Sequence, residues 1–371
     1  MNKNIKIIYI TNLPSPYVID YLNILTSRYT IHVAFERKNS NDRIKEWFRN
    51  DFKFNYQFLK GVNLGPENSF KPNIIKFLFQ DYDVYFCDYS SFSGLLFYIV
   101  KLLFFPKKRL IAIIDGAKYT KVNKIKALIK RIIFRAVNLF ISSGFQADNY
   151  LLMNSVPKEK IRRYFFTSLF KKDFLQKEYS NFELKKLKIK YGITDKFTIL
   201  YVGRFIQLKR IDVLLEASNQ LKFDHNIVLV GGQFDKFTKN LLSLNKSNNL
   251  YVFNFMPPEK IKEFYLFSDM LYLNSNSEAW GLVVNEALAN GLPVLTNSNC
   301  VAGLELIKDN SNGIVMEYNN SNAIAVSKKI VSFYKNREFK KLTISQSIRH
   351  YNLENVADQI SKVIDEVIQN D

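Results

Sequence analysis

Short apolar runs alternate with longer segments of helical periodicity along the whole chain, and this alternation limits the fold more than any other feature. The runs are rich in β-branched and aromatic residues, as buried strands are. Strands that alternate with helices predict parallel sheets covered by helices, which is an α/β fold. The predicted strands are IKIIYIT, YTIHVAFE, DVYFCDY, RLIAIID and LFISS in the first half, and FTILYVG, NIVLVGG, LYVFNF, MLYLNS and LPVLTN in the second.

Two domains are expected, because 371 residues exceed the size at which one hydrophobic core keeps growing. Residues 1–170 are predicted to form the first domain and residues 193–345 the second. Residues 171–192 are rich in charge and lack a strand pattern, so they are predicted to connect the two. Residues 346–371 contain a segment of helical periodicity, for which the first domain is a candidate packing partner.

The cysteines, the histidines and the amino terminus exclude several kinds of site. Cys87 and Cys300 are too few for a disulfide framework or a cysteine-based zinc cluster, and they suit a reducing compartment. The three histidines are scattered and show no metal-ligand spacing. The apolar run in MNKNIKIIYI is shorter than a signal-peptide core or a membrane span. We therefore expect a cytoplasmic protein that needs no metal.

The stretch SEAWGLVVNEALANGLPVL, residues 277–295, predicts a loop that leads into a short helix over Leu282–Ala289. The backbone N–H groups at the start of such a helix lack helical partners and form a ready anion site. Glu278 precedes the helix and Glu286 lies about a turn into it. Because a carboxylate accepts two hydroxyl hydrogen bonds, both suit a sugar or ribose diol. The same spacing also fits a capping glutamate followed by a solvated one.

A second motif is YVGRFIQLKRIDVLLEA, residues 201–217, in which a predicted strand ends at Gly203 before an amphipathic helix. Arg204 and Lys209 lie in the turn between them. Two cations beside a helix start can hold a diphosphate by charge-assisted hydrogen bonds. Taken alone, the pattern favours ordinary surface cations.

Together, these two motifs resemble the donor half of GT-B glycosyltransferases, specifically the retaining enzymes of glycosyltransferase family 4. LVGGQFD and the segment VFNFMPPEKIKEFYLFSDMLYLNSNS lie between the motifs in the order that the family has, and the likeness covers about 140 residues. Trp280 stands where a Phe is usual, and Asn254 replaces a frequent glycine. The resemblance implies two Rossmann-like domains whose parallel sheets face each other across a cleft.

The resemblance also implies roles for individual residues. Arg204 and Lys209 would neutralise the nucleotide diphosphate, and Glu278 would contact the transferred sugar near the reacting carbon. Glu286 would hold the ribose hydroxyls. The remaining donor-binding residues would be Gly203 in the strand-end turn, Phe255 and Met256 beside the base, and Trp280, Gly281 and Leu282 through their backbone N–H groups.

The first domain corresponds to the acceptor side and matches the family less closely. TNLPSPYVIDYLNIL, residues 11–25, replaces the usual glycine pair of the first loop, and places Tyr17 in a rigid turn that would face the cleft. Where the family often has a His after a middle strand, this chain reads IAIIDGAKYTK. We therefore expect Asp115 and Lys118 on the acceptor side, although Asp115 also fits an ordinary turn before Gly116.

Basic residues are concentrated in the first half of the chain. Of a formal net charge of +19, residues 1–190 hold 34 Lys and Arg against 15 Asp and Glu, whereas residues 191–371 hold 19 of each. Residues 101–135 contain eleven Lys and Arg and one acid, partly in the amphipathic segment KVNKIKALIKRIIFRAV. This segment and the neighbouring GLLFYIVKLLFFPKKR predict either a surface that meets anionic lipid or a buried core helix.

Three other functions fit parts of the sequence. A basic, aromatic-rich domain can bind nucleic acid, but no helix-turn-helix, RRM, KH or zinc pattern occurs. Asp81-Tyr82-Asp83 fits the D-x-D motif of metal-dependent GT-A glycosyltransferases, although one such triplet is common by chance. Sugar-nucleotide 2-epimerases share the GT-B architecture but normally use histidines and other acid/base side chains that find no counterpart here.

The sequence therefore predicts a retaining, metal-independent GT-B glycosyltransferase with no cofactor. Its expected partners are a nucleotide sugar, with UDP favoured because it is common among relatives, and a lipid-linked saccharide acceptor in cell-surface polysaccharide assembly. It is expected on the inner face of the plasma membrane and not on nucleic acid. The sugar, the linkage, the oligomeric state and whether Asp115 substitutes for the family histidine stay open.

Overall fold

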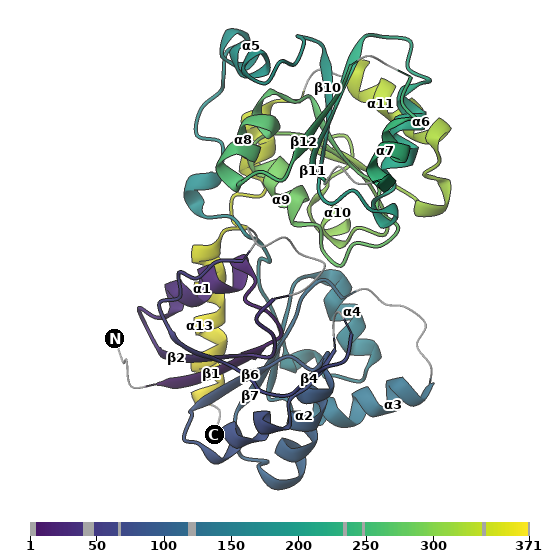
Figure 1. Cartoon of the computed structure of the whole chain (residues 1–371). Coiled ribbons are helices and arrows are strands. Elements are labelled where there is room, and N and C mark those ends of the chain that lie inside the picture. The colour runs from purple at the N-terminus through teal and green to yellow at the C-terminus, as the bar shows by residue number, and fades with distance from the viewer. Residues whose placement is uncertain are drawn as a thin grey trace. The chain divides into compact units, whose positions relative to one another are not determined.

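The computed structural model describes residues 5–39, 48–65, 68–117, 124–232, 236–246, 249–335 and 339–369 (Figure 1). The chain divides into two compact units. Unit 1 comprises residues 1–168 and 351–371, and unit 2 comprises residues 169–350. Each unit is built on its own parallel sheet.

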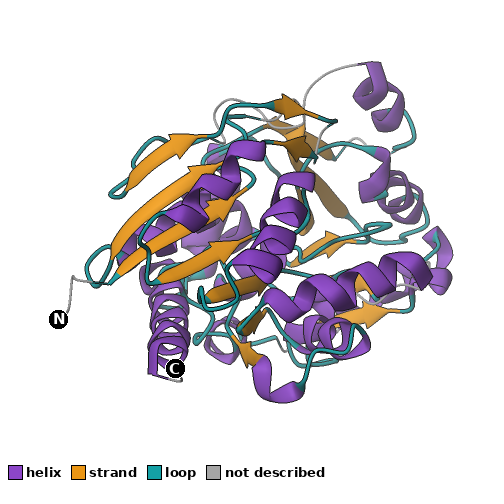
Figure 2. Ribbon diagram, turned by 90° about the horizontal axis from the view of Figure 1, so that it is seen from below, coloured by secondary structure: helices purple, strands orange, loops and turns teal. Residues whose placement is uncertain are grey.

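Unit 1 contains a seven-stranded parallel sheet with the strand order β3-β2-β1-β6-β7-β8-β9. Its inner strands are buried along nearly their whole length, because helices cover the sheet (Figure 2). The strands are β1 (Lys6–Thr11), β2 (Thr30–Phe35), β3 (Asn55–Phe58), β6 (Val84–Cys87), β7 (Leu110–Ile114), β8 (Leu139–Ser142) and β9 (Ile161–Arg163), and β4 (Val62–Asn63) pairs with β5 (Ser69–Phe70) in a small antiparallel ribbon.

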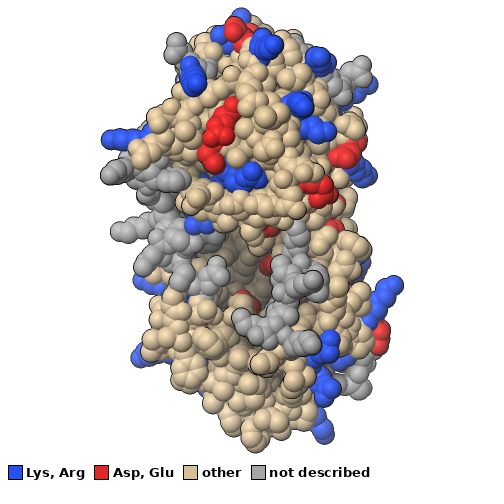
Figure 3. Space-filling view, turned by 90° about the vertical axis from the view of Figure 1, so that its right-hand side faces the viewer, with Lys and Arg blue, Asp and Glu red and all other residues tan. Residues whose placement is uncertain are grey.

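Helices connect most of the successive strands of unit 1, and one further helix comes from the end of the chain. They are α1 (Pro16–Leu25), the 3-10 helix η2 (Pro72–Phe79), α2 (Phe92–Phe104), α3 (Lys124–Ile133), η3 (Phe134–Ala136), α4 (Phe145–Met153), η4 (Lys158–Lys160) and α13 (Leu353–Gln369). Figure 3 shows one face of the molecule, on which Lys and Arg side chains border stretches of uncharged surface.

The last helix, α13, returns to unit 1 and packs against α1. Its apolar stripe is buried, and two arginines bind its polar side. Arg28 contacts Asp358 at 2.5 Å, and the Nε of Arg162 donates to Glu366 at 2.8 Å. The carboxyl-terminal segment therefore belongs structurally to the amino-terminal unit.

Unit 2 contains a six-stranded parallel sheet with the order β12-β11-β10-β13-β14-β15. Its strands are β10 (Phe197–Val202), β11 (His225–Gly232), β12 (Leu250–Asn254), β13 (Met270–Leu273), β14 (Val294–Asn297) and β15 (Gly313–Met316). Its helices are η5 (Lys171–Asp173), α5 (Asn181–Lys190), η6 (Gln207–Lys209), α6 (Ile211–Ser218), α7 (Lys236–Leu242), α8 (Pro258–Phe267), α9 (Leu282–Ala289), α10 (Val301–Leu306), η7 (Tyr318–Asn320), α11 (Ala323–Lys335) and α12 (Lys341–Ser347).

All ten strands predicted from the sequence are present, and the α/β prediction is confirmed. Three strands of the large sheets were not predicted. β3 and β15 have four residues each, and β9 has three, of which two are arginines. The sequences of β3 (NYQF) and β9 (IRR) lack the apolar run on which the prediction depends, and their neighbours in the sheet position them. The apolar run of β15, IVM, is three residues long and was not recognised as a strand. Asp81 and Asp83 of the D-x-D triplet precede β6, at the amino end of that strand.

We predict that two helix-terminal glycines respond differently to alanine. Gly192, after α5, and Gly291, after α9, both have left-handed φ values, +68° and +74°. At Gly192 a Cβ meets no atom within 4 Å, whereas at Gly291 it lies 2.6 Å from Lys341. Gly192→Ala should therefore lower the free energy of unfolding by about 1–2 kcal/mol, and Gly291→Ala by at least about 1 kcal/mol more. Denaturant titration measures both, and equal losses would contradict the close approach of α9 to α12.

Candidate active site

The loop after β10 is shaped by glycines. Gly203 has a φ of +147°, and its N–H donates to the carbonyl of Val230 at 2.9 Å. A Cβ on Gly231 would lie 3.0 Å from the carbonyl oxygen of Gly203, so the ends of β10 and β11 approach closely. A Cβ on Gly232 would overlap the ring of Phe205 at 1.9 Å. The LVGG sequence thus leaves room for the turn that carries Arg204, which is half-buried.

The centre of the candidate site is an ion pair between Lys209 and Glu278, residues 69 positions apart. The Nζ of Lys209 donates to Oε2 of Glu278, and their side chains are only 13% and 17% exposed. Ser275 donates its hydroxyl to the same oxygen at 3.0 Å. The backbone joins the two loops as well, because the N–H of Asn276 donates to the carbonyl of Leu208 at 2.8 Å. The structure therefore brings the two sequence motifs together.

Glu278 and Gly281 are held against the segment that begins α10. The N–H of Glu278 donates to the carbonyl of Asn299 at 3.0 Å. Gly281 has a φ of +103°, and a Cβ there would lie 2.9 Å from the Sγ of Cys300 and 3.1 Å from the Cγ of Glu278. Only glycine fits this conformation and this space. Any side chain at position 281 would displace the carboxylate that the loop presents.

The side chain of Trp280 packs into the interior of unit 2. Its ring is buried, with 4% of the residue exposed, and its indole N–H donates to Asn285 of α9 at 2.8 Å. Its carbonyl accepts from the N–H of Ala302 at 2.9 Å. The ring therefore anchors the loop to the core, and only its backbone N–H is left as a predicted donor-binding group.

Helix α9 begins at Leu282 after Gly281, which has no side chain with which to cap it. The start of a helix carries partial positive charge from its aligned peptide dipoles, and that charge favours a bound anion. The predicted helix has the observed bounds, Leu282–Ala289. An anion placed at this end would also lie beside the loop that holds Glu278.

Glu286 lies on the second turn of α9 and is half-buried. Burial raises the pKa of its carboxyl to about 7, and the nearby charge of Asp173 adds to this shift. The hydroxyl of Tyr265 donates to Oε2 at 2.7 Å and partly opposes it. Neither Tyr265 nor Asp173 was predicted as a site residue, because only the tertiary fold brings α8 and η5 beside α9. The carboxyl thus changes charge near neutral pH.

Phe255 and Met256 follow β12, on the edge strand of the unit 2 sheet. Phe255 is 37% exposed and Met256 is half-buried.

Arg210 was not predicted as a site residue, and it has a left-handed φ of +51°. Its guanidinium donates to the hydroxyl of Ser321 at 2.8 Å and lies over the ring of Tyr318. These contacts of Arg210 fix the turn after Lys209. In the sequence, Arg210 is visible only as the second cation of QLKR, which does not reveal this structural role.

In unit 1, the predicted acceptor-side residues lie in a group of tyrosines. Tyr164 donates its hydroxyl to Oδ1 of Asp115, and the ring of Tyr17 packs edge-on against Phe166 at 5.1 Å. Asp115 has an exposed side, but the protein packed around its carboxyl removes solvent from it and so raises its pKa to about 6. The hydrogen bond from the hydroxyl of Tyr164 opposes this shift. Burial and the charge of Asp115 raise the pKa of Tyr17. Lys118 lies outside the described residues.

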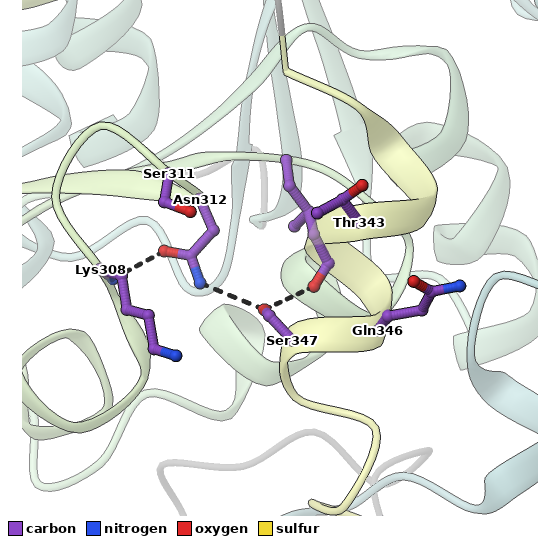
Figure 4. Close-up of a pocket in the computed structure, with 7 residues that line it drawn as sticks. Lys308, Ser311, Asn312, Thr343, Gln346 and Ser347 are labelled. Atoms are coloured by element: carbon purple, nitrogen blue, oxygen red, sulfur yellow. Dashed lines mark hydrogen bonds between the residues drawn. The ribbon is translucent and has the colours of Figure 1, made fainter.

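A separate hollow of about 360 Å³ opens on unit 2 (Figure 4). Its polar groups bind one another. The side-chain oxygen of Asn312 accepts from the backbone N–H of Lys308 at 2.8 Å, and its amide nitrogen donates to the hydroxyl of Ser347 at 3.3 Å. Ser311, Thr343, Ile344 and Gln346 complete its lining. None of the predicted site residues lines this hollow, so we assign it no part in the chemistry.

Comparison with known proteins agrees with this geometry. Residues 184–350 match the family described as "Glycosyl transferases group 1". The matched residues lie within unit 2. In structure, 98% of the chain aligns with the whole of Anabaena HepE in complex with UDP, with a TM-score of 0.78 and 15% identity. A putative UDP-N-acetylglucosamine 2-epimerase from Listeria monocytogenes aligns with a TM-score of 0.64 at 15% identity, over 100% of this chain and 98% of that one.

These structural likenesses show the GT-B fold, as predicted, and the prediction of a glycosyltransferase is supported. Because the fold is GT-B, the alternative hypothesis that Asp81-Tyr82-Asp83 is the D-x-D motif of a GT-A glycosyltransferase is wrong. Among curated relatives, an uncharacterized 41.2 kDa protein in the cps region of Klebsiella pneumoniae is 27% identical over 282 residues, which are 71% of this chain and 74% of that protein.

An alpha-monoglucosyldiacylglycerol synthase from Acholeplasma laidlawii is 27% identical over 154 residues, 40% of this chain and 38% of the enzyme. The matches to the three relatives that follow the Klebsiella protein in similarity also cover only 34% to 39% of their length. The likeness to these curated relatives is therefore partial, and the substrates of the whole chain are a matter for proposal.

We predict that Glu286 makes the unliganded protein less stable as the pH rises. Its folded-state pKa of about 7 lies above the ordinary value of 4.5, so the folded state holds a proton that the unfolded state releases. The loss of stability should grow from about pH 4.5 to pH 7 and then level off.

Glu286→Gln removes this titration and keeps an acceptor for Tyr265. Between pH 5 and pH 8, wild type should lose about 1–2 kcal/mol of unfolding free energy relative to this variant, a range that allows for partial exposure. Denaturant titration at both pH values measures the difference. The exposed Glu216→Gln on α6 is the control and should show no such trend, and parallel behaviour of the two variants would argue against a raised pKa at Glu286.

Proposed function

We propose that this protein is a retaining GT-B glycosyltransferase that moves a sugar from a nucleoside diphosphate, with UDP favoured, to a lipid-linked saccharide. The observation that carries the proposal is the convergence of Lys209, Glu278 and the start of α9 in one small region of unit 2. Positive charge, a partly buried carboxylate and a helix amino terminus together suit a sugar diphosphate. The match of unit 2 to the group 1 glycosyltransferases and the UDP bound by HepE support it.

In the proposed reaction, the bond between the anomeric carbon and the diphosphate oxygen breaks while the acceptor oxygen bonds to the same face of that carbon. The acceptor proton passes to the departing diphosphate, so configuration is retained and the protein supplies no base. Arg204, Lys209 and the α9 amino terminus stabilise the negative charge that grows on the diphosphate. Glu278 contacts the sugar, and Glu286, in its ionised form, accepts the ribose hydroxyls.

The acceptor and the cellular setting are part of the same proposal. Tyr17 and Asp115 contribute to the acceptor side, and Lys118 is a further candidate. A place in cell-surface polysaccharide assembly is supported by the Klebsiella relative from a cps region. An alpha-monoglucosyldiacylglycerol synthase among the relatives supports a lipid-linked acceptor, and the proposal places the reaction on the inner face of the plasma membrane. No helix in the described part of the chain is long and apolar enough to cross a membrane.

A sugar-nucleotide 2-epimerase is the second candidate, because the Listeria neighbour shares the fold. NMR of a nucleotide sugar incubated with the protein alone separates the two. An epimerase interconverts the sugar without an acceptor, whereas the proposed transferase leaves its configuration unchanged. The reaction should also continue in the presence of a chelator, since the proposal gives no step to a metal.

A thermal-stability screen of nucleotide sugars tests the proposed donor. A ligand that binds only the folded state raises the melting temperature, by an amount that corresponds to about 2.7 kcal/mol at a hundred times its dissociation constant. We expect UDP-sugars to give the largest shift, with nucleoside monophosphates and free sugars giving little. Absence of a shift with every nucleotide sugar would contradict the function.

Removal of either diphosphate cation should slow transfer. Arg204→Ala and Lys209→Ala should each lower kcat about a hundredfold, the scale for loss of one preorganised group that stabilises transition-state charge. Lys222→Ala, which removes an exposed cation from the same unit, is the control and should keep wild-type turnover. Steady-state kinetics with the donor found in the screen measures all three. Near-wild-type kcat in both Arg204→Ala and Lys209→Ala would remove these residues from the mechanism.

A further inference from the structure

Helix α3 exposes apolar side chains that a core helix would bury. Ile125, Leu128, Ile129 and Ile132 recur at spacings of three and four residues and therefore share one face. All four are between 44% and 67% exposed. Ile133 and Phe134, in contrast, are buried and hold the segment to the unit 1 core. The sequence left open whether this segment packs inside or meets a partner, and the structure leaves its apolar strip on the surface.

The surface continues onto the neighbouring helices. Helix α2 contacts α3, and the last two residues of α2, Leu103 and Phe104, are 66% and 72% exposed. Phe79, at the end of η2, is also exposed and packs edge-on against Phe105 at 4.9 Å. We call Ile125, Leu128, Ile129, Ile132, Leu103, Phe104 and Phe79 the α3 surface. Figure 1 shows α2 and α3 on the same flank of unit 1.

The charge on these helices has one sign. Lys130, Arg131 and Arg135 lie in or directly after α3, and Arg131 and Arg135 are exposed. No Asp or Glu occurs between residues 116 and 147, and none occurs in η2 or α2. A helix that only faces water usually carries both signs of charge on its outer side. An exposed apolar strip flanked by cations alone has the composition of helices that lie in a membrane interface.

Helix α5 in unit 2 provides a contrast. It also exposes large apolar side chains, Phe182 and Ile189, which are 66% and 64% exposed, and it is rich in lysine. Its lysines have acidic partners, however. Lys190 binds Glu263 at 2.6 Å, and Lys185 lies 3.4 Å from Asp195. Exposed apolar residues are therefore not enough to mark a lipid surface, and the excess of positive charge separates α3 from α5.

We propose that the α3 surface docks on an anionic lipid bilayer. The apolar strip of α3 enters the boundary between headgroups and acyl chains, and the exposed Arg131 and Arg135 bind lipid phosphates. The proposal rests on the peripheral attachment proposed above and assigns it to particular residues. A second copy of the chain is a poorer occupant, since a symmetric contact through this face would bring like charges together. Nucleic acid would leave the isoleucines and leucine without an apolar partner.

Flotation of the full-length protein with vesicles tests the proposal. The probes are vesicles of phosphatidylcholine alone and vesicles of equal parts phosphatidylcholine and phosphatidylglycerol. Wild type should bind the anionic vesicles and not the neutral ones, with binding that weakens as salt rises. Ile129→Asn with Ile132→Asn should reduce the partition coefficient at least about tenfold. Arg131→Gln should reduce it about fivefold, and adding Arg135→Gln should reduce it again.

A matched double variant on α5 and two further measurements serve as controls for the vesicle experiment. Phe182→Asn with Ile189→Asn, on α5, removes equally exposed apolar groups and should leave vesicle binding unchanged. Melting temperatures show whether each variant folds, and Leu128→Trp gives a second readout, since its emission should shift to shorter wavelength with anionic vesicles. Wild-type binding by the α3 variants, or equal loss in the α5 variant, would overturn the proposal.

Three further results distinguish lipid docking from self-association, from nucleic-acid binding and from the proposed catalysis. If the α3 variants bind vesicles normally but change the oligomeric state in solution, the surface is an interface between copies, and the proposal fails. It also fails if wild type prefers oligonucleotides to anionic vesicles. Donor-induced stabilisation should be the same in wild type and in the α3 variants. Vesicle binding without any donor binding would contradict the proposed enzyme and leave the docking surface standing.

Discussion

The ion pair between Lys209 and Glu278 is the contact on which the candidate site depends. It links the turn after β10 to the loop after β13, and the backbone bond between Asn276 and Leu208 runs beside it. A partly buried carboxylate without this lysine would carry an uncompensated charge. The pair therefore fixes both loops in the unliganded protein. On the proposed function, a donor diphosphate would meet a lysine that is already positioned. Little reorganisation is then needed when charge develops in the reaction.

Glycines supply the space for this arrangement. Gly203 and Gly281 have left-handed φ values, a Cβ on Gly231 would crowd the carbonyl of Gly203, and a Cβ on Gly232 would overlap the ring of Phe205. Each brings a backbone close to a neighbour, which leaves N–H groups and the α9 amino terminus near the strand ends. In parallel α/β sheets, ligands bind at these carboxyl ends. The glycine turns thus help to explain why the candidate site lies at these strand ends.

The sequence predicted the fold well because long apolar runs and glycine turns are local signals. It did not predict β3, β9 and β15, whose pairing depends on strands already in place. The bounds of α9 were correct, but the inward ring of Trp280 and the contact of Glu286 with Tyr265 depend on packing between distant segments. Periodicity likewise predicted the amphipathic α3, and only the tertiary structure shows that its apolar strip stays on the surface.

The central claim is that unit 2 recognises a pyrophosphate through Lys209 and its neighbours. The most direct measurement is calorimetric binding of a nucleoside diphosphate and of its monophosphate, with the base identified by the screen, to wild type and to Lys209→Ala. We expect the diphosphate to bind wild type at least about tenfold more tightly than the monophosphate, a difference of about 1.4 kcal/mol. That preference should largely disappear in the variant. An equal preference in both proteins would contradict the claim.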